Sequence, residues 1–243
     1  TITAAILHDT VEDTDITLDD LTREFGDQVA KLVDGVTKLD KMKFRTRQEA
    51  DAESFRKLLL AMSRDLRVIF IKLADRLHNM RTIEAMSPPS RRRISSETLE
   101  IYVPIADRLG MHGLKSELED LGFQNLYPNR YRIIARRMHS MTKYRKEIID
   151  SVSEALKKRL NEAGIAARVE GREKTIYSIY SKMRSKSLTF DQVNDLYAFR
   201  VICPAESHCY QALGVVHSLY KPRPGSFKDY IALPKANGYQ SLH

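Results

Sequence analysis

The spacing of apolar residues changes once along the chain, and this change constrains the fold more than any other feature. Through about residue 127 apolar residues recur every three or four positions, as in Val29, Leu32 and Val36, which is the period of an amphipathic helix. After Gly164 the expected elements alternate: residues 167–170 and 196–203 extended, residues 174–184 and 207–219 helical. These patterns predict an α+β chain with more than one domain.

The 243 residues are enough for two domains of roughly 100–150 residues each. We expect an all-helical domain at 1–127, a helical linker at 128–164 and an α/β domain at 165–243. The apolar run 66–74 continues without a breaker through Asp75 to Met80, which favours a buried helix over a strand. Thr17 to Asp20 has the pattern of a capping box, and Gly26 stands where a helix would end. No apolar run is long enough to span a membrane.

Charge is unevenly divided between the two halves. Residues 1–127 hold 19 Lys and Arg against 22 Asp and Glu, whereas residues 128–243 hold 21 against 10. A field of +11 in the second half suits polyphosphate nucleotides, RNA or an acidic partner. The two cysteines, Cys203 and Cys209, are too few for a disulfide framework, so we expect a cytoplasmic protein.

A cluster of titratable residues stands near the start of the chain. Glu12 and Asp13 follow His8 and Asp9 by four residues, which places the two pairs on one helical face. Three carboxylates this close repel one another unless a cation compensates them, and Asp75 adds a carboxylate from the most buried helix. Mixed imidazole and carboxylate ligands suit Mn²⁺ better than Ca²⁺, and Mg²⁺ stays open. A solvated acidic helix start, with Asp75 paired to Arg76 or Arg81, would fit the same spacing.

Two separated motifs carry a family resemblance: the segment 8–14, His-Asp-Thr-Val-Glu-Asp-Thr, and the segment 72–82, Lys-Leu-Ala-Asp-Arg-Leu-His-Asn-Met-Arg-Thr. Together they resemble the hydrolase domain of the RelA/SpoT family of (p)ppGpp enzymes, which belongs to the HD phosphohydrolases. The resemblance implies that His8, Asp9 and Asp75 bind Mn²⁺ and that Glu12 and Asp13 position and activate the attacking water. Asn79 and Thr82 match positions that contact the nucleotide. The family's first metal-binding His, and an Arg that stacks on guanine, would lie upstream of residue 1.

Basic residues and tyrosines mark a second constellation in residues 165–243. Gly171 to Lys174 is predicted to open a helix that places Lys174, Ser178 and Lys182 at successive turns, an arrangement that suits a triphosphate but also fits a solvated basic helix. Asp195 precedes a strand, where either a Mg²⁺ ligand or an ordinary turn residue would stand. The Pro- and Gly-bounded loops 221–230 and 234–243 combine cations with aromatic rings on which bases can stack.

This half resembles the start of the family's synthetase domain, which has a nucleotidyltransferase-like fold and transfers pyrophosphate from ATP to GDP or GTP. The implied nucleotide-binding residues are Arg172, Lys174, Ser178, Lys182, Asp195, Lys228, Lys235, Asn237, Tyr239 and His243. Asp195 would bind Mg²⁺ and Tyr239 would stack on guanine. Two departures count against synthesis: Ser226 replaces an Arg of bifunctional members, and the family's catalytic Glu would lie beyond His243.

Three hypotheses follow. The first is a Mn²⁺-dependent hydrolase that releases pyrophosphate from the 3′ position of (p)ppGpp in stringent-response control, closest to SpoT-type members, with a weak or regulatory synthetase domain. The second is a bifunctional enzyme that also makes (p)ppGpp from ATP and GDP or GTP. The third is not enzymatic: a basic fragment that binds RNA or the ribosome, or a regulatory protein, and does so less tightly as salt rises.

Overall fold

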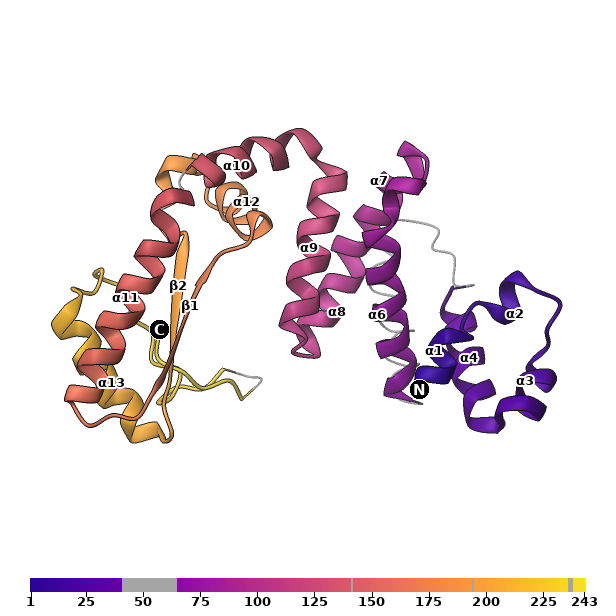
Figure 1. Cartoon of the computed structure of the whole chain (residues 1–243), viewed down its shortest axis with the longest axis horizontal. Helices are drawn as coiled ribbons and strands as arrows, with labels where there is room; N and C mark the ends of the chain where they lie inside the picture. The colour runs from indigo at the N-terminus through magenta and orange to yellow at the C-terminus, as the bar shows by residue number, and fades with distance from the viewer. Residues whose placement is uncertain (41–64, 141, 194, 236–237) are drawn as a thin grey trace. The chain divides into compact units, whose positions relative to one another are not determined.

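The computed structural model describes residues 1–40, 65–140, 142–193, 195–235 and 238–243. Its backbone contacts divide the chain into two compact units, Thr1–Arg132 and Ile133–His243 (Figure 1). The first unit contains only helices among its described residues, and the second combines helices with a small sheet. The prediction of helices followed by an α+β segment is therefore confirmed at this coarse level, whereas the nucleotidyltransferase-like architecture stays a prediction.

The helices of the first unit are short and closely spaced. They are α1 (Ile2–Ile6), α2 (Thr10–Asp13), α3 (Leu18–Phe25), α4 (Asp27–Asp40), α6 (Leu66–Arg81), η1 (Ile83–Ala85), α7 (Pro88–Glu97), η2 (Thr98–Tyr102), α8 (Val103–Arg108), α9 (His112–Leu126) and the start of α10 (Pro128–Ser140). The predicted capping box is confirmed, because the Thr17 hydroxyl accepts from the Asp20 amide and the Asp20 carboxylate accepts from the Thr17 amide. Gly26 ends α3 at φ 82°, a conformation that favours glycine.

Helix α6 lies between two apolar clusters of the first unit. Ile69, Leu73 and Met80 face the cluster formed with α7, η2, α8 and α9, while Val68 and Ile71 face the cluster formed with α1, α3 and α4. A helix that is covered on two sides needs apolar residues around most of its circumference. This explains why apolar residues follow one another almost without interruption in the first half of α6, and it confirms the predicted buried helix.

The second unit contains the rest of α10, then α11 (Thr142–Glu162), β1 (Arg168–Glu173), α12 (Ile176–Ser185), η3 (Phe190–Gln192), β2 (Tyr197–Ile202) and α13 (Glu206–Leu219). The two strands pair antiparallel, with Arg168 opposite Ile202 and Glu173 opposite Tyr197. Val169, Phe199 and Val201 pack against α11 and α13, so one sheet face is apolar. The expected linker of residues 128–164 therefore corresponds to α10 and α11, and α11 packs on the sheet.

One stretch of the second unit differs from its predicted structure. Residues 171–174 were expected to begin a helix, but Gly171 to Glu173 continue β1, and α12 begins only at Ile176. Pairing with Phe199 to Tyr197 of β2 decides the conformation, and the Lys174 amide extends that pairing by donating to the Leu196 carbonyl. Thr175 then caps the helix by accepting from the Ser178 amide.

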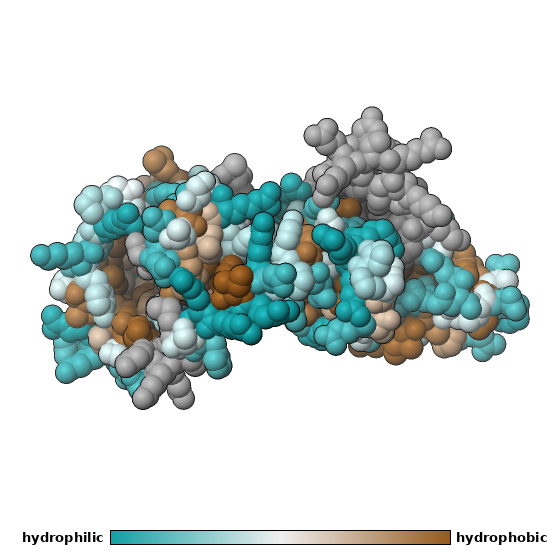
Figure 2. Space-filling model, turned by 90° about the horizontal axis from the view of Figure 1, so that it is seen from above, coloured by the Kyte–Doolittle hydropathy of each residue, from teal (hydrophilic) through white to brown (hydrophobic). Residues whose placement is uncertain are grey.

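The face drawn in Figure 2 is mostly hydrophilic, with apolar side chains reaching the surface in places. Among the described residues, no helix is both long enough and apolar enough to cross a membrane.

Candidate functional site

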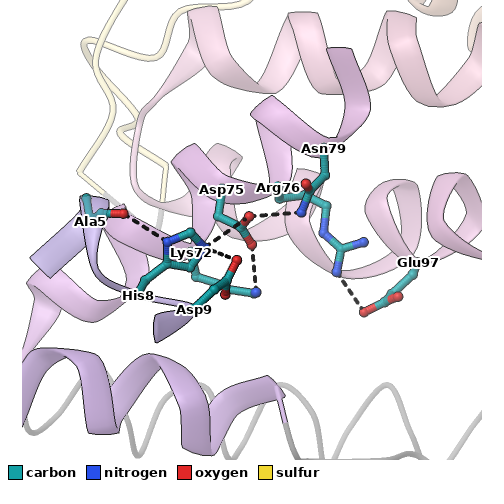
Figure 3. A network of polar contacts seen from close by, with 8 residues as sticks. All are labelled: Ala5, His8, Asp9, Lys72, Asp75, Arg76, Asn79 and Glu97. Carbon is teal, nitrogen blue, oxygen red and sulfur yellow. Dashed lines mark hydrogen bonds and ion pairs between the residues drawn. The ribbon is translucent and has the colours of Figure 1, made fainter. Parts of the chain in front are cut away.

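The turn between α1 and α2 lies against the middle of α6. Ala4 is fully buried and anchors α1, so the turn that follows is held close to the buried helix. His8 and Asp9 occupy this turn, and Asp75 reaches them from α6 (Figure 3). One potential ligand atom from each of the three residues lies within 4.8 Å of the other two. The structure therefore brings together the three predicted metal ligands from two distant segments.

The hydrogen bond of His8 fixes the role of each ring nitrogen. Nδ1 lies 2.9 Å from the Ala5 carbonyl oxygen, which can only accept, so Nδ1 carries a proton and donates it. Nε2 lies 3.0 Å from Asp9 Oδ2 and 3.4 Å from Asp75 Oδ1, yet it is buried without a hydrogen bond. A lone pair facing two carboxylates is repelled, so Nε2 needs either a proton or a bound cation. In metal-binding histidines the ring nitrogen that does not bind the metal typically donates to a backbone carbonyl or a carboxylate, as Nδ1 does here.

Asp75 is held by two further side chains of α6. Lys72 donates to Oδ2 at 2.7 Å, and Asn79 donates to Oδ1 at 2.9 Å. Burial opposes ionisation of Asp75, but the hydrogen bond and charge of Lys72, together with His8, outweigh it and lower the pKa of this carboxyl. Asp75 is thus ionised, with Oδ1 directed at His8. The alternative pairing with Arg76 or Arg81 is not formed, because these arginines pair with Glu97 and Glu117.

Asp9 has the opposite electrostatic environment. Burial raises the pKa of Asp9, and the nearby charges of Asp75 and Asp13 raise it further, although His8 and Lys72 partly compensate. A cation placed among His8, Asp9 and Asp75 would reverse this penalty. One imidazole nitrogen and two carboxylates are a suitable donor set for a divalent metal ion, so the residues present fit such an ion.

The other predicted hydrolase residues lie on α2 and at the end of α6. Glu12 and Asp13 lie on α2, one turn after His8 and Asp9, and both are exposed. Asp13 is close enough to act on the pKa of Asp9. Asn79 contacts Asp75 directly, whereas Thr82 is exposed at the end of α6 with its hydroxyl donated to the His78 carbonyl. Glu12 and Asp13 are therefore open to solvent beside the candidate metal ligands.

A second polar cluster forms at the start of α12. Lys174 and Lys182 both pair with Asp195, and Ser178 bonds Thr175 one turn before Lys182. Burial opposes ionisation of Asp195, but its hydrogen bonds and charge contacts with the two lysines dominate and lower its pKa. Arg172, by contrast, stands on the exposed side of β1. Two of the three predicted cations, Lys174 and Lys182, thus converge on Asp195.

Aromatic and basic side chains gather in the C-terminal loops. Backbone hydrogen bonds between Lys228 and His243, 2.8 and 2.9 Å long, hold the two loops together. The rings of Tyr230, Tyr239 and His243 pack edge to face, and the Lys235 ammonium lies 4.7 Å from the Tyr230 ring centre and 5.0 Å from that of Tyr239. Burial, followed by the charges of Lys235 and Lys228, lowers the pKa of His243. Asn237 lies outside the described residues.

Sequence reasoning missed two residues of these clusters. Lys72 was given no role of its own, although a lone cation in an apolar run, three residues before a carboxylate on the same helix, is a signal for an ion pair. Tyr230, which contacts both Tyr239 and His243, was included in a basic loop but not given a role. Its contact depends on the pairing of two loops, which residue spacing does not reveal.

Known proteins match segments in both units of the chain. Residues 1–112 match the family model of the HD domain, and residues 171–243 match that of the region found in RelA/SpoT proteins. Over all 243 residues the chain is 57% identical to a guanosine-3′,5′-bis(diphosphate) 3′-pyrophosphohydrolase of Vibrio cholerae, and 58% identical to the bifunctional (p)ppGpp synthase/hydrolase SpoT of Escherichia coli K12. It is 48% identical over 245 aligned positions to a GTP pyrophosphokinase of Myxococcus xanthus.

These matches cover the whole of this chain but 34%, 35% and 32% of the three relatives, so the chain spans about a third of the length of the curated relatives it matches. The helical fold and the cluster of His8, Asp9 and Asp75 define the first unit as an HD-type domain with a candidate divalent-metal site. With the second match and the identities along all 243 residues of this chain, the chain belongs to the RelA/SpoT family.

Proposed function

We propose that residues 1–127 hydrolyse the 3′-pyrophosphate of (p)ppGpp, releasing pyrophosphate and GDP or GTP, and that they depend on Mn²⁺. The observation that carries this proposal is the buried His8 Nε2, which has no hydrogen bond and faces the carboxylates of Asp9 and Asp75. A bound cation at Nε2 would balance these carboxylates as a proton does, and the relatives that share 57% and 58% identity are named for this hydrolysis.

Each side chain of the site has a distinct task in this proposal. His8, Asp9 and Asp75 hold the metal ion, and Lys72 neutralises the Asp75 oxygen that faces away from His8. A bound divalent ion supplies Lewis acidity toward the phosphoryl group and makes water more acidic. Glu12 and Asp13, exposed on α2, orient the attacking water and accept its proton as the bond between the 3′-oxygen and phosphorus breaks.

The nucleotide would bind beside the end of α6. Asn79 has one amide group that already donates to Asp75, so it can link the metal ligand to the substrate. Thr82 stands one turn after His78 at the exposed end of the same helix. We assign both residues to substrate binding on the match to the family's motif, and Mn²⁺ over Mg²⁺ on the imidazole in the ligand set.

The decisive assay measures pyrophosphate release from ppGpp with added Mn²⁺ in the full-length protein. Asp75→Asn keeps the side-chain shape but removes a charged ligand, so hydrolysis should fall at least about 100-fold, the upper end for losing a residue that only supports a metal ligand. Asp107→Asn is the matched control, because Asp107 is a half-exposed partner of Lys115 in the same unit. Equal activity in wild type and Asp75→Asn would refute the proposal.

A second candidate activity is the transfer of pyrophosphate from ATP to GDP or GTP. Its support is the convergence of Lys174 and Lys182 on Asp195, where ATP and Mg²⁺ would bind, and the ring cluster around Tyr239, where guanine would stack. Both lysines already neutralise Asp195, and Ser226 supplies no charge to the loop, so we propose that synthesis is weak or that the region is regulatory. Measuring (p)ppGpp formation from ATP and GDP, with Lys182→Met as the loss variant, tests this assignment.

A further inference from the structure

Arg76 is a buried cation directly beside the metal ligand Asp75, and the proposed hydrolysis gives it no task. It is 8% exposed, and its Nε atom is buried without a hydrogen bond. On α6 the Asp75 side chain points to the turn that holds His8 and Asp9, whereas Arg76 extends toward Glu97 on the opposite side (Figure 3). Burying an arginine is costly, so its partners must stabilise one orientation strongly.

Two side chains enclose the guanidinium of Arg76. Nη2 donates to Glu97 Oε1 at 3.0 Å, and the guanidinium carbon lies 4.1 Å from the centre of the Tyr102 ring. A planar guanidinium suits both contacts at once, because it can donate in its plane while its face lies on an aromatic ring. Glu97 belongs to α7 and Tyr102 to η2, so both contacts come from one continuous stretch of helix.

The π-helical turn η2 explains how these two residues reach one arginine. Residues five apart on an α-helix point about 140° away from each other at 3.6 residues per turn. Across η2 the Val103 amide instead donates to the Thr98 carbonyl, five residues earlier, so the turn is wider. Glu97, immediately before the turn, and Tyr102, at its end, therefore come onto one face of the helix.

Pro104 supplies a local cause for this wide turn. Proline has no amide hydrogen, and its ring collides with the carbonyl four residues earlier in a regular α-helix, here that of Glu100. A π-turn immediately before the proline relieves that collision and is a common place for a helix to change direction. Pro104 thus favours the wide turn that brings both partners of Arg76 together in the continuous helix formed by α7, η2 and α8.

We propose that Arg76 is a positioning residue for Asp75: its contacts with Glu97 and Tyr102 fix the rotation of α6 and so hold the Asp75 carboxylate beside His8. A rotation of 10° moves a side-chain atom about 1 Å at the outer radius of a helix. Functional groups generally need to be held within about 0.5 Å and 10–20°. This role rests on the proposed metal site, because it concerns the geometry of one of its ligands.

The test is Mn²⁺ affinity, measured from the electron paramagnetic resonance signal of free Mn²⁺ in the full-length protein. The variants are Arg76→Met, Glu97→Gln and the two combined, each checked for native circular dichroism. Arg67→Met is the matched control, because Arg67 forms a partly exposed ion pair with Asp65 at the start of the same helix, away from Asp75. We expect Arg76→Met to weaken Mn²⁺ binding about 10- to 100-fold, as loss of a supporting partner does at other metal sites.

Glu97→Gln should also weaken Mn²⁺ binding. The double variant should bind Mn²⁺ as tightly as Arg76→Met does, since both changes remove the same contact between Arg76 and Glu97. Arg67→Met should bind Mn²⁺ like wild type. A folded Arg76→Met protein with wild-type affinity overturns the positioning role and leaves the proposed function intact. Should Arg76→Met not fold, wild-type affinity in Glu97→Gln overturns it equally. A wild-type protein that binds no Mn²⁺ overturns the proposed function and the positioning role together.

Discussion

Lys72 and Arg76 are one helical turn apart on α6, and each buries a positive charge near Asp75. Lys72 contacts the carboxylate itself at 2.7 Å, whereas Arg76 contacts Glu97 and Tyr102 on the other side of the helix. A metal ion beside His8 would contact Oδ1 of Asp75, while Lys72 contacts Oδ2. The negative charge of Asp75 would then be balanced at both oxygens. This division of partners predicts different results for the two cations.

Lys72→Met leaves the buried Asp75 carboxylate with one cationic partner fewer. We expect the free energy of unfolding to fall by about 2 kcal/mol without metal, within the range for a buried charged group that loses a partner. Mn²⁺ should recover more stability in the variant than in wild type, because it replaces the missing charge. Urea unfolding with and without Mn²⁺ measures both quantities, and equal recovery in the two proteins would contradict the prediction.

Glu119 on α9 predicts a dependence of stability on pH. It is 9% exposed, and burial raises its pKa above the ordinary value of 4.5, with Lys115, 3.9 Å away, only partly compensating. A raised pKa means that its stabilising contribution is present below pH 4.5 and is lost as pH rises through the folded-state pKa. Glu119→Gln should therefore be more stable than wild type at pH 7 and similar at pH 3.5. A stability gain that is equal at both pH values in urea titrations would argue against burial of the charge as the cause.

At the scale of elements, the contact between α11 and β1 depends on Gly171. A Cβ atom there would lie 2.7 Å from Ile149 Cγ2 and 2.9 Å from Phe199 Cε1, closer than real Cβ contacts. Glycine at position 171 therefore lets α11 approach the backbone of β1 closely. The same glycine suggested a helix start when only the sequence was considered.

Gly171→Val should destabilise the second unit by about 1–3 kcal/mol, the usual cost of overpacking. Gly214→Ala is the comparison, because a Cβ at Gly214 meets nothing within 4 Å and the residue lies inside α13. That change should stabilise by about 0.5–1 kcal/mol, since alanine favours helix more than glycine does. Thermal unfolding of both variants gives the two signs, and a stable Gly171→Val protein would mean that α11 does not pack closely on β1.

At the scale of the molecule, the three apolar clusters formed by described residues each lie within one unit. Residues of α1, α3, α4 and α6 to α9 form the clusters of the first unit, and α11, β1, β2 and α13 form that of the second. Separate cores allow each unit to unfold in its own transition. A ligand or substitution confined to one unit should then shift one transition only.

Calorimetry of the 243-residue chain tests this independence. Mn²⁺ at about 100 times its dissociation constant should stabilise the first unit by about 2.7 kcal/mol and raise only its transition. Gly171→Val should lower only the other transition. A single transition that moves with both changes would show that the two units unfold cooperatively.

Features that depend on neighbouring residues could be predicted without the structure. The helical period, the capping box at Thr17 and the buried character of α6 follow from spacing along one segment, and the structure confirms all three. The motifs at His8-Asp9 and at Asp75 likewise identified residues whose ligand atoms lie within 4.8 Å. Their chemistry is legible in the sequence because carboxylates and imidazole are rarely brought together near a buried helix without a cation or a proton between them.

Contacts between distant segments were decided only by the tertiary structure. Strand pairing turned Gly171 to Glu173 from an expected helix start into β1, because ladder hydrogen bonds with β2 outweigh local preference. The direction of Arg76, and its enclosure by Glu97 and Tyr102, depend on how α6 is rotated against the π-turn. Residue types and spacing determined which groups could bind a metal ion, whereas packing determined which way they point, since orientation is a property of all the surfaces that meet at a helix.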